Sequence, residues 1–156
     1  MHHYGLDKDA QALRDKNALY LRLGQAKVAA TPDDPKAHAE LGNQYVDLGD
    51  YSMAAQCYRD ALRLAPKSAE LLKDLGGVLH LMGRTIEAEK ALRLATTVDA
   101  NHVEAWRNLG VVLAAREEWR QARECFSTAI ALAPENAELR RYFDIAQSNV
   151  GGAASA

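Results

Sequence analysis

The sequence predicts an all-α protein, an α-solenoid of stacked helix–turn–helix units. The first observation is a Leu-Gly pair that recurs at a constant interval, at Leu41-Gly42, Leu75-Gly76 and Leu109-Gly110. The second is that alanines and large apolar residues follow each pair at the same interval. The third is that turn-forming residues separate the segments. A fixed period of about 34 residues marks a repeated pair of helices, because one unit alone cannot bury its apolar face.

The remaining repeat positions keep this interval. They are Tyr45, Leu79 and Leu113, then Ala54, Ala88 and Ala122, then Tyr58, Leu92 and Phe126, then Ala61, Ala95 and Ala129, and finally Pro66, Ala100 and Pro134. This pattern resembles the tetratricopeptide repeat (TPR), which reads W-x2-L-G-x2-Y, then A-x3-F, then A and a closing P. The first position holds Trp106 in the third copy, His38 in the first and Leu72 in the second. The resemblance covers roughly two thirds of the chain and implies a right-handed, TPR-like superhelix.

The interval divides the chain into three repeats with different segments at the two ends. The predicted segments are an N-terminal capping helix or degenerate half-repeat (1–34), repeat 1 (35–68), repeat 2 (69–102), repeat 3 (103–136), a C-terminal capping helix (137–150) and a flexible tail (151–156). We expect the first helix to run from about residue 9 to residue 30 with an interruption at Gly24. By its length the chain is expected to form one domain.

Local signals indicate where the helices begin. Residues that cap free backbone N–H groups precede the predicted helices at Asp34, Asp50, Ser68, Thr85, Asn101 and Asn136. Gly49 and Gly83 fall in the turns between paired helices, where the third repeat has Arg116-Glu117-Glu118 instead. The third turn is therefore predicted to form without glycine.

Small residues are predicted to let the paired helices approach closely. These residues are Gly42, Gly76, Gly110, Ala54, Ala88 and Ala122. We expect Tyr58, Leu92 and Phe126 to fill the gap to the next unit. Leucine at position 76 or 88 should therefore overpack the array, at a cost of about 1–3 kcal/mol or more.

Composition excludes several classes of protein. The charged residues comprise 19 Lys and Arg against 21 Asp and Glu, so the chain has no electrostatic signature of nucleic-acid binding. No apolar run approaches the roughly 20 residues that span a membrane. The N-terminus lacks the basic and apolar regions of a signal peptide, so the chain is expected to be cytoplasmic unless it is a piece of something larger.

The sequence offers no chemistry of its own. It contains none of the short nucleotide-binding, zinc-binding or redox motifs, and its histidines lie far apart, so we predict no catalytic residue, no metal and no cofactor. Cys57 and Cys125 lie two repeat intervals apart, at the same repeat position. Two stacked units would hold them too far apart for a disulfide, so free thiols and a reducing compartment are expected.

The family resemblance implies that the first helices line a concave groove. The candidate peptide-binding residues are Asn43, Lys73, Gly77, His80, Arg107, Asn108, Val111, Ala114 and Arg141. Three of them, Lys73, Arg107 and Arg141, form a basic ladder that could pair with the carboxylates of a bound peptide. A patch formed by Leu81, Val111, Ala114 and Ala115 is apolar and is expected to need a partner.

A second interpretation of the basic ladder stays open. Glu70, Glu104 and Glu138 each stand three residues before a cation of the ladder, which is the spacing of salt bridges along a helix. Surface charge pairing alone would produce the same columns. One TPR subclass captures acidic chaperone C-termini with cations at set places, but Asp74 and Glu104 occupy such places here, so we reject that specificity.

The sequence therefore predicts a non-enzymatic adaptor or scaffold that holds a peptide or helix of a partner protein in its groove. The ligand is expected to carry acidic and apolar residues. Two alternatives remain: a homo-oligomer, with the groove filled by the N-terminal helix or tail of another copy, or the repeat region of a larger enzyme or assembly factor.

Overall fold

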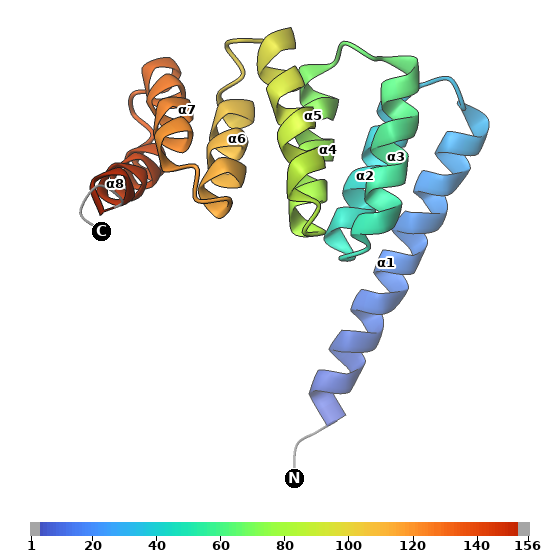
Figure 1. The fold of residues 1–156 in the computed structure, drawn as a ribbon. Helices are drawn as coiled ribbons and strands as arrows, with labels where there is room; N and C mark the ends of the chain where they lie inside the picture. The colour runs from blue at the N-terminus through green and yellow to red at the C-terminus, as the bar shows by residue number, and fades with distance from the viewer. Residues whose placement is uncertain (1–3, 153–156) are drawn as a thin grey trace. The chain divides into compact units, whose positions relative to one another are not determined.

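The computed structural model describes residues 4–152, and the regular secondary structure in this range is entirely α-helical (Figure 1). The helices are α1 (Tyr4–Ala30), α2 (Pro35–Asp47), α3 (Tyr51–Leu64), α4 (Ala69–Leu81), α5 (Thr85–Val98), α6 (Val103–Ala115), α7 (Trp119–Leu132) and α8 (Ala137–Gly152). This confirms the all-α helical-repeat fold. Helix α8 includes two glycines predicted to belong to the tail, and the rest of that tail lies outside the described residues.

The chain forms two compact units, Met1–Pro66 and Lys67–Ala156, where its length had suggested one domain. In the first unit α2 packs against both α1 and α3. In the second unit α4 pairs with α5, α6 pairs with α7, and α8 packs against α7. The starts of α2, α4, α6 and α8 follow one another at the same interval as the Leu-Gly pairs.

The Leu-Gly glycines are the points where the two helices of a pair touch. A Cβ atom on Gly42 would lie 2.9 Å from the Tyr58 ring, and one on Gly110 would lie 2.5 Å from the Phe126 ring. At Gly76 the Leu92 side chain would lie equally close, at 2.5 Å. The predicted close approach is confirmed, because no side chain larger than hydrogen fits at these positions.

The large residues opposite these glycines, Tyr58, Leu92 and Phe126, lie against the first helix of their own pair. We had expected them to fill the gap to the next unit. For Phe126 that expectation is confirmed, because its ring also stacks on Tyr142 of α8, with ring centroids 5.3 Å apart. The core of each pair is completed by fully buried alanines. They are Ala54 and Ala61 in α3, Ala88 and Ala95 in α5, and Ala122 and Ala129 in α7.

The predicted caps are present at four positions. Asp34, Asp50 and Ser68 accept hydrogen bonds from the first-turn amides of α2, α3 and α4, and Asn136 accepts from two amides of α8. Two predictions were wrong. His102, one residue after Asn101, caps α6 through Nδ1, and Thr85 is the first residue of α5, preceded by Arg84, whose side chain makes no capping bond.

The turns between paired helices require a left-handed residue. Gly49 and Gly83 supply it with φ values of 75° and 74°, and Glu117 takes the same conformation with φ of 62° in the turn between α6 and α7. The prediction of a glycine-free third turn is confirmed. A non-glycine residue there is strained, because its Cβ crowds the backbone.

The residue at the signature tryptophan position closes the preceding loop in α2, α6 and α8, but not in α4. Trp106 Nε1 donates a hydrogen bond of 2.8 Å to the carbonyl of Ala100, six residues earlier. His38 Nε2 lies 2.8 Å from the carbonyl of Pro32, which can only accept, so the imidazole is the donor there. Arg140 bonds the Pro134 carbonyl in the same way at 2.6 Å. Histidine therefore replaces tryptophan with its N–H donor retained, whereas Leu72 has none.

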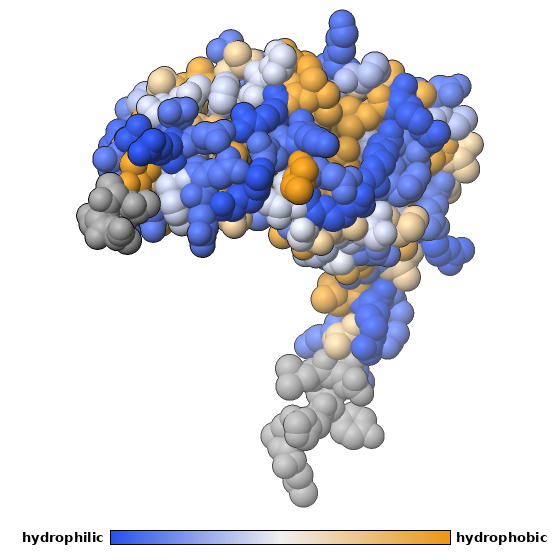
Figure 2. All heavy atoms as spheres, viewed as in Figure 1, coloured by the Kyte–Doolittle hydropathy of each residue, from blue (hydrophilic) through white to orange (hydrophobic). Residues whose placement is uncertain are grey.

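Helix α1 is continuous, so the interruption predicted at Gly24 was wrong. Gly24 instead lies against α2, where an added Cβ atom would overlap the Gln44 side chain. The exposed side of the helix carries large apolar residues, namely Leu13, Leu19, Tyr20 and Leu23. Figure 2 shows apolar side chains at the surface of α1 beside the residues drawn in grey.

Candidate functional site

The predicted groove residues of the second unit lie on α4, α6 and α8, and α6 contacts both of the other two helices. We call this surface the α4/α6/α8 face. Lys73, Gly77 and His80 come from α4, and Arg141 comes from α8. The remaining four, Arg107, Asn108, Val111 and Ala114, come from α6.

Lys73 is the centre of an ion-pair cluster on this face. Its ammonium lies 2.5 Å from Glu70, 2.8 Å from Asp74 and 3.5 Å from Glu104 of α6. Burial alone would lower the pKa of Lys73, but hydrogen bonds to Asp74 and Glu70 outweigh it and raise the pKa. Burial raises the pKa of Asp74 despite the bond to Lys73. The Lys73 ammonium therefore stays charged and is fully engaged by protein carboxylates.

Glu70 links this cluster to the loop before α6. Its second oxygen lies 2.9 Å from His102 Nε2, the side chain that caps α6. The hydrogen bond from Lys73 lowers the pKa of Glu70, and the bond from His102 adds to this effect. The cluster thus ties α4 to α6 through two separate ionic or hydrogen-bonded contacts.

The second cation of the ladder, Arg107, is held more loosely. Its guanidinium lies 3.7 Å from Glu138 of α8 and donates to the neighbouring Asn108 side chain at 3.3 Å. The exposed Arg141 makes no ion pair with any described residue. The predicted pairing three residues apart therefore occurs only between Glu70 and Lys73. Glu104 and Glu138 instead reach back to the preceding first helix.

An apolar pocket of about 320 Å³ opens between the second half of α6 and helices α7 and α8. It is lined by Val111, Ala114, Ala115, Trp119, Phe126, Tyr142, Ile145 and Ala146. Val111 and Ala114 were predicted site residues. Tyr142 and Ile145 stand one repeat interval after Asn108 and Val111, so the repeat predicts them in the same groove-facing columns.

Tyr142 connects the pocket to the charged part of the face. Its hydroxyl donates to Glu138 at 3.1 Å, and the same carboxylate pairs with Arg107. Burial raises the pKa of Tyr142, and the hydrogen bond to the Glu138 carboxylate raises it further. The rim of the pocket is therefore polar while its lining is apolar.

Gly77 leaves open space on the face. A Cβ atom there would meet only the Asn108 side chain, at 3.9 Å, in contrast to the crowded Gly76 beside it. His80, one turn further along α4, has a buried Nδ1 without a hydrogen-bond partner among the described residues. Leu81 is exposed and does not line the apolar pocket.

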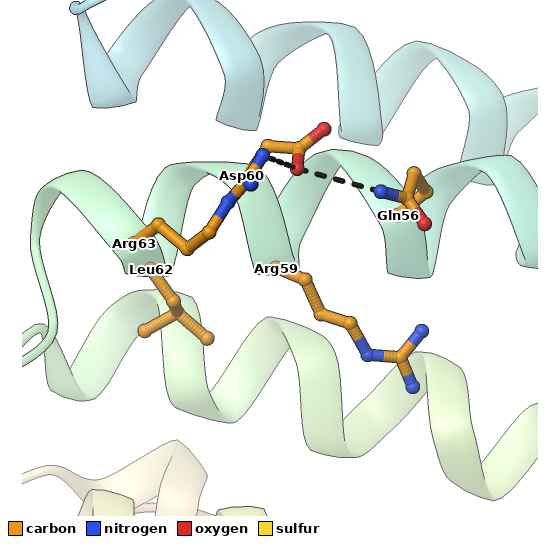
Figure 3. Close-up of a pocket in the computed structure, with 5 residues that line it drawn as sticks. All are labelled: Gln56, Arg59, Asp60, Leu62 and Arg63. Carbon is orange, nitrogen blue, oxygen red and sulfur yellow. Dashed lines mark hydrogen bonds and ion pairs between the residues drawn. The ribbon is translucent and has the colours of Figure 1, made fainter.

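The ninth predicted residue, Asn43, lies on α2 in the first unit and accepts a hydrogen bond of 2.5 Å from the Tyr58 hydroxyl. A depression of about 480 Å³ on α3 in the same unit is lined by Gln56, Arg59, Asp60, Leu62 and Arg63 (Figure 3). Asp60 accepts hydrogen bonds from Gln56 at 3.4 Å and from Arg63. The depression is shallow, comes from one helix, and was not predicted.

Neither a metal-binding cluster nor a membrane-spanning helix is found among the described residues. They include no group of three or more side chains able to hold a metal ion, and none of their helices is both long and apolar enough to cross a membrane. Cys57 and Cys125 are buried free thiols, and burial raises the pKa of each to about 11.

Comparison with known proteins agrees with this architecture. A family model described as "TPR repeat" matches residues 42–83, and one described as "Tetratricopeptide repeat" matches residues 103–136. Human tetratricopeptide repeat protein 7B is 38% identical over 84 residues, which is 54% of this chain and 10% of that protein. The Aspergillus fumigatus heat-shock-cognate co-chaperone sgt12 is 29% identical over 102 residues, 65% of this chain and 30% of that protein. The chain belongs to the tetratricopeptide-repeat family.

Solved structures show the same fold. MamA superimposes with a TM-score of 0.80 at 22% identity, covering 92% of this chain and 78% of that one. The first TPR domain of Spaghetti (RPAP3), bound to the HSP90 peptide SRMEEVD, gives a TM-score of 0.74 at 19% identity, covering 76% and 94%. The chain spans about a tenth of the length of the first curated relatives it matches.

Proposed function

We propose that this chain is a non-catalytic protein–protein interaction module that binds a peptide segment or helix of a partner on the α4/α6/α8 face. The observation that carries the proposal is the apolar pocket, whose lining includes Val111, Ala114 and Ile145. A pocket of this size accepts one or two apolar side chains, and the polar groups at its rim would orient them.

The comparisons support this proposal at the level of the family. One similar protein is named as a co-chaperone, and one similar domain is bound to a peptide. That peptide ends in Glu-Glu-Val-Asp, and Asp74 and Glu104 stand where an acidic C-terminus would need cations, so we propose a different ligand here. The role of adaptor or scaffold, the cytoplasmic location and the division into three repeats with capping segments remain part of the proposal.

The test is selection of a random peptide library displayed on phage against the whole chain. Arginine at positions 111 and 145 together should abolish enrichment, because it places two charges in the apolar pocket. The matched control is Ile86→Arg, which changes an exposed isoleucine of α5 that does not line the pocket. Equal enrichment on the wild type and on the Val111→Arg/Ile145→Arg variant would contradict the proposal.

A second candidate is self-association, which the apolar side of α1 favours. Leu13, Tyr20 and Leu23 are at least half exposed, and large apolar residues in a row along one helix mark a contact surface. We expect glutamate at positions 13 and 23 to abolish any concentration-dependent increase in mass measured by light scattering. A wild-type mass that is independent of concentration would remove this candidate.

A further inference from the structure

Resting on the proposed function, we infer that the segment bound on the α4/α6/α8 face is basic as well as apolar: a Lys or Arg side chain accompanies the apolar anchor. This is the reverse of the acidic ligand that the basic ladder predicts. The inference depends on which charged side chains of the face are exposed beside the apolar pocket.

The Lys73 charge is not available to a ligand. Its side chain is only 12% exposed, and three carboxylates lie within 3.5 Å of its ammonium. An ammonium has three N–H donors, and contacts with Glu70, Asp74 and Glu104 account for all of them. A carboxylate from a ligand would have to displace one of these partners.

The carboxylates around Lys73 are exposed instead. The side chains of Glu70 and Glu104 are 62% and 55% exposed, so they form the surface that a ligand meets. One positive and three negative charges leave this cluster at a net charge of −2. Like charge at an interface is costly, and opposite charge both attracts and aligns the partner.

The remaining cations do not reverse this balance near α4. Arg107 is 31% exposed and is compensated by Glu138, which is 55% exposed. Arg141 is exposed and lies on α8, not on α4 or α6. The preference for a basic side chain is therefore confined to the end of the face that α4 and α6 form.

The structure also sets the spacing between the basic and the apolar side chain of the ligand. Glu104 and Val111 stand two helical turns apart on α6, which corresponds to about 10 Å along the helix axis. A peptide can match that distance with a cation about three residues from its apolar anchor if it is extended, or about seven residues away if it is helical.

Selection from the random peptide library tests this pattern directly. We expect enriched peptides to carry Lys or Arg at one of these two spacings from a Leu, Ile, Phe or Met residue. A synthetic copy of the most enriched peptide should bind the Glu70→Gln/Glu104→Gln variant about tenfold more weakly than the wild type, because two rim charges are lost. The matched control is Glu87→Gln/Glu124→Gln on α5 and α7, which should bind like the wild type.

The outcomes separate the two proposals. Peptides rich in Asp and Glu, or equal affinity for the wild type and the Glu70→Gln/Glu104→Gln variant, would overturn the basic ligand while leaving the pocket as the binding site. Undiminished binding by the Val111→Arg/Ile145→Arg variant, or no enrichment at all, would overturn the proposed function and this inference together.

Discussion

The helix pairs α4–α5 and α6–α7 lie one repeat apart in the second unit and differ in instructive ways. They share one arrangement where their helices touch: a glycine on the first helix faces a large apolar residue of the second, which also carries buried alanines. They differ in the turn, where Gly83 corresponds to Glu117, and on the face, where a buried lysine cluster corresponds to a single loose Arg107 pair.

The difference shows which positions the repeat constrains. The glycine at the helix contact leaves no room for a side chain, because a single added methyl would overlap the residue that faces it. Outside the Lys73 cluster, the loops and the face tolerate substitution at a modest energetic cost, and most residues that distinguish one repeat from the next lie there. The following predictions test that division, beginning with the largest expected effect.

The contact position at Gly110 should be the most sensitive. We expect Gly110→Ala to lower the free energy of unfolding by about 3 kcal/mol and Gly76→Ala by about 1–2 kcal/mol, because both overpack the pair. The alanine at 110 costs more because the Tyr142 stack holds the Phe126 ring, whereas Leu92 is not held in this way. Urea denaturation followed by circular dichroism measures both.

The control is the neighbouring glycine. Gly77→Ala meets only a contact of 3.9 Å and should raise stability by up to about 1 kcal/mol through helix propensity. If alanine at 76 and alanine at 77 changed stability equally, helix contact would not explain the repeat glycines.

Replacing the two cations Lys73 and Arg107 should change stability by different amounts. Lys73→Met leaves three clustered carboxylates without their cation, so we expect a loss of about 2–3 kcal/mol. Arg107→Met removes one half-exposed pair and should cost less than about 1 kcal/mol. Equal losses in thermal or urea unfolding would show that the Lys73 cluster is no more important than an ordinary surface pair.

The two turns should respond in opposite directions. Glu117→Gly removes the strain of a non-glycine residue in the left-handed conformation and should raise the free energy of unfolding by about 0.5–1 kcal/mol. Gly83→Ala introduces that strain and should lower it by a similar amount. Nothing lies within 4 Å of the Cβ that Gly83→Ala would add, so any loss comes from the backbone angle alone. A destabilising Glu117→Gly change would show that the glutamate side chain has a role of its own.

Cys125 of α7 stands at the repeat position that Ala91 holds in α5. Ionisation of its thiol should have the smallest effect on stability at neutral pH. A thiol pKa of about 11, compared with 9.0 in the unfolded chain, means that only the unfolded state ionises between these values, so stability falls as pH rises from 9 to 11. At neutral pH we expect no such loss.

The raised thiol pKa values also predict slow chemical modification. In the wild type at about pH 8, a thiol reagent should modify Cys125 and Cys57 at least about a hundredfold more slowly than it modifies the cysteines of the unfolded chain. Fast modification of the folded protein would contradict the raised pKa values.

Much of the fold could be predicted because the contacts within each helix pair recur at the repeat interval in the sequence. Glycine at 42, 76 and 110 and the alanines of the second helices follow from the spacing alone, as do most of the helix caps. The errors occurred where neighbouring residues compete for one local role. His102 caps α6 in place of Asn101, and Gly24 relieves crowding between α1 and α2 rather than interrupting a helix.

The candidate site was predictable only in its residue types. The sequence by itself determined the helix pairs, the buried contact positions and the residues that share the first-helix face, because periodicity places side chains on a common side of each helix. Only the tertiary structure decided which of those charges are exposed. Glu104 and Glu138 pair with cations of the preceding first helix, and Lys73 lies beneath its partners. Burial and ion pairing here depend on side chains almost a full repeat apart in sequence, so no local pattern could reveal them.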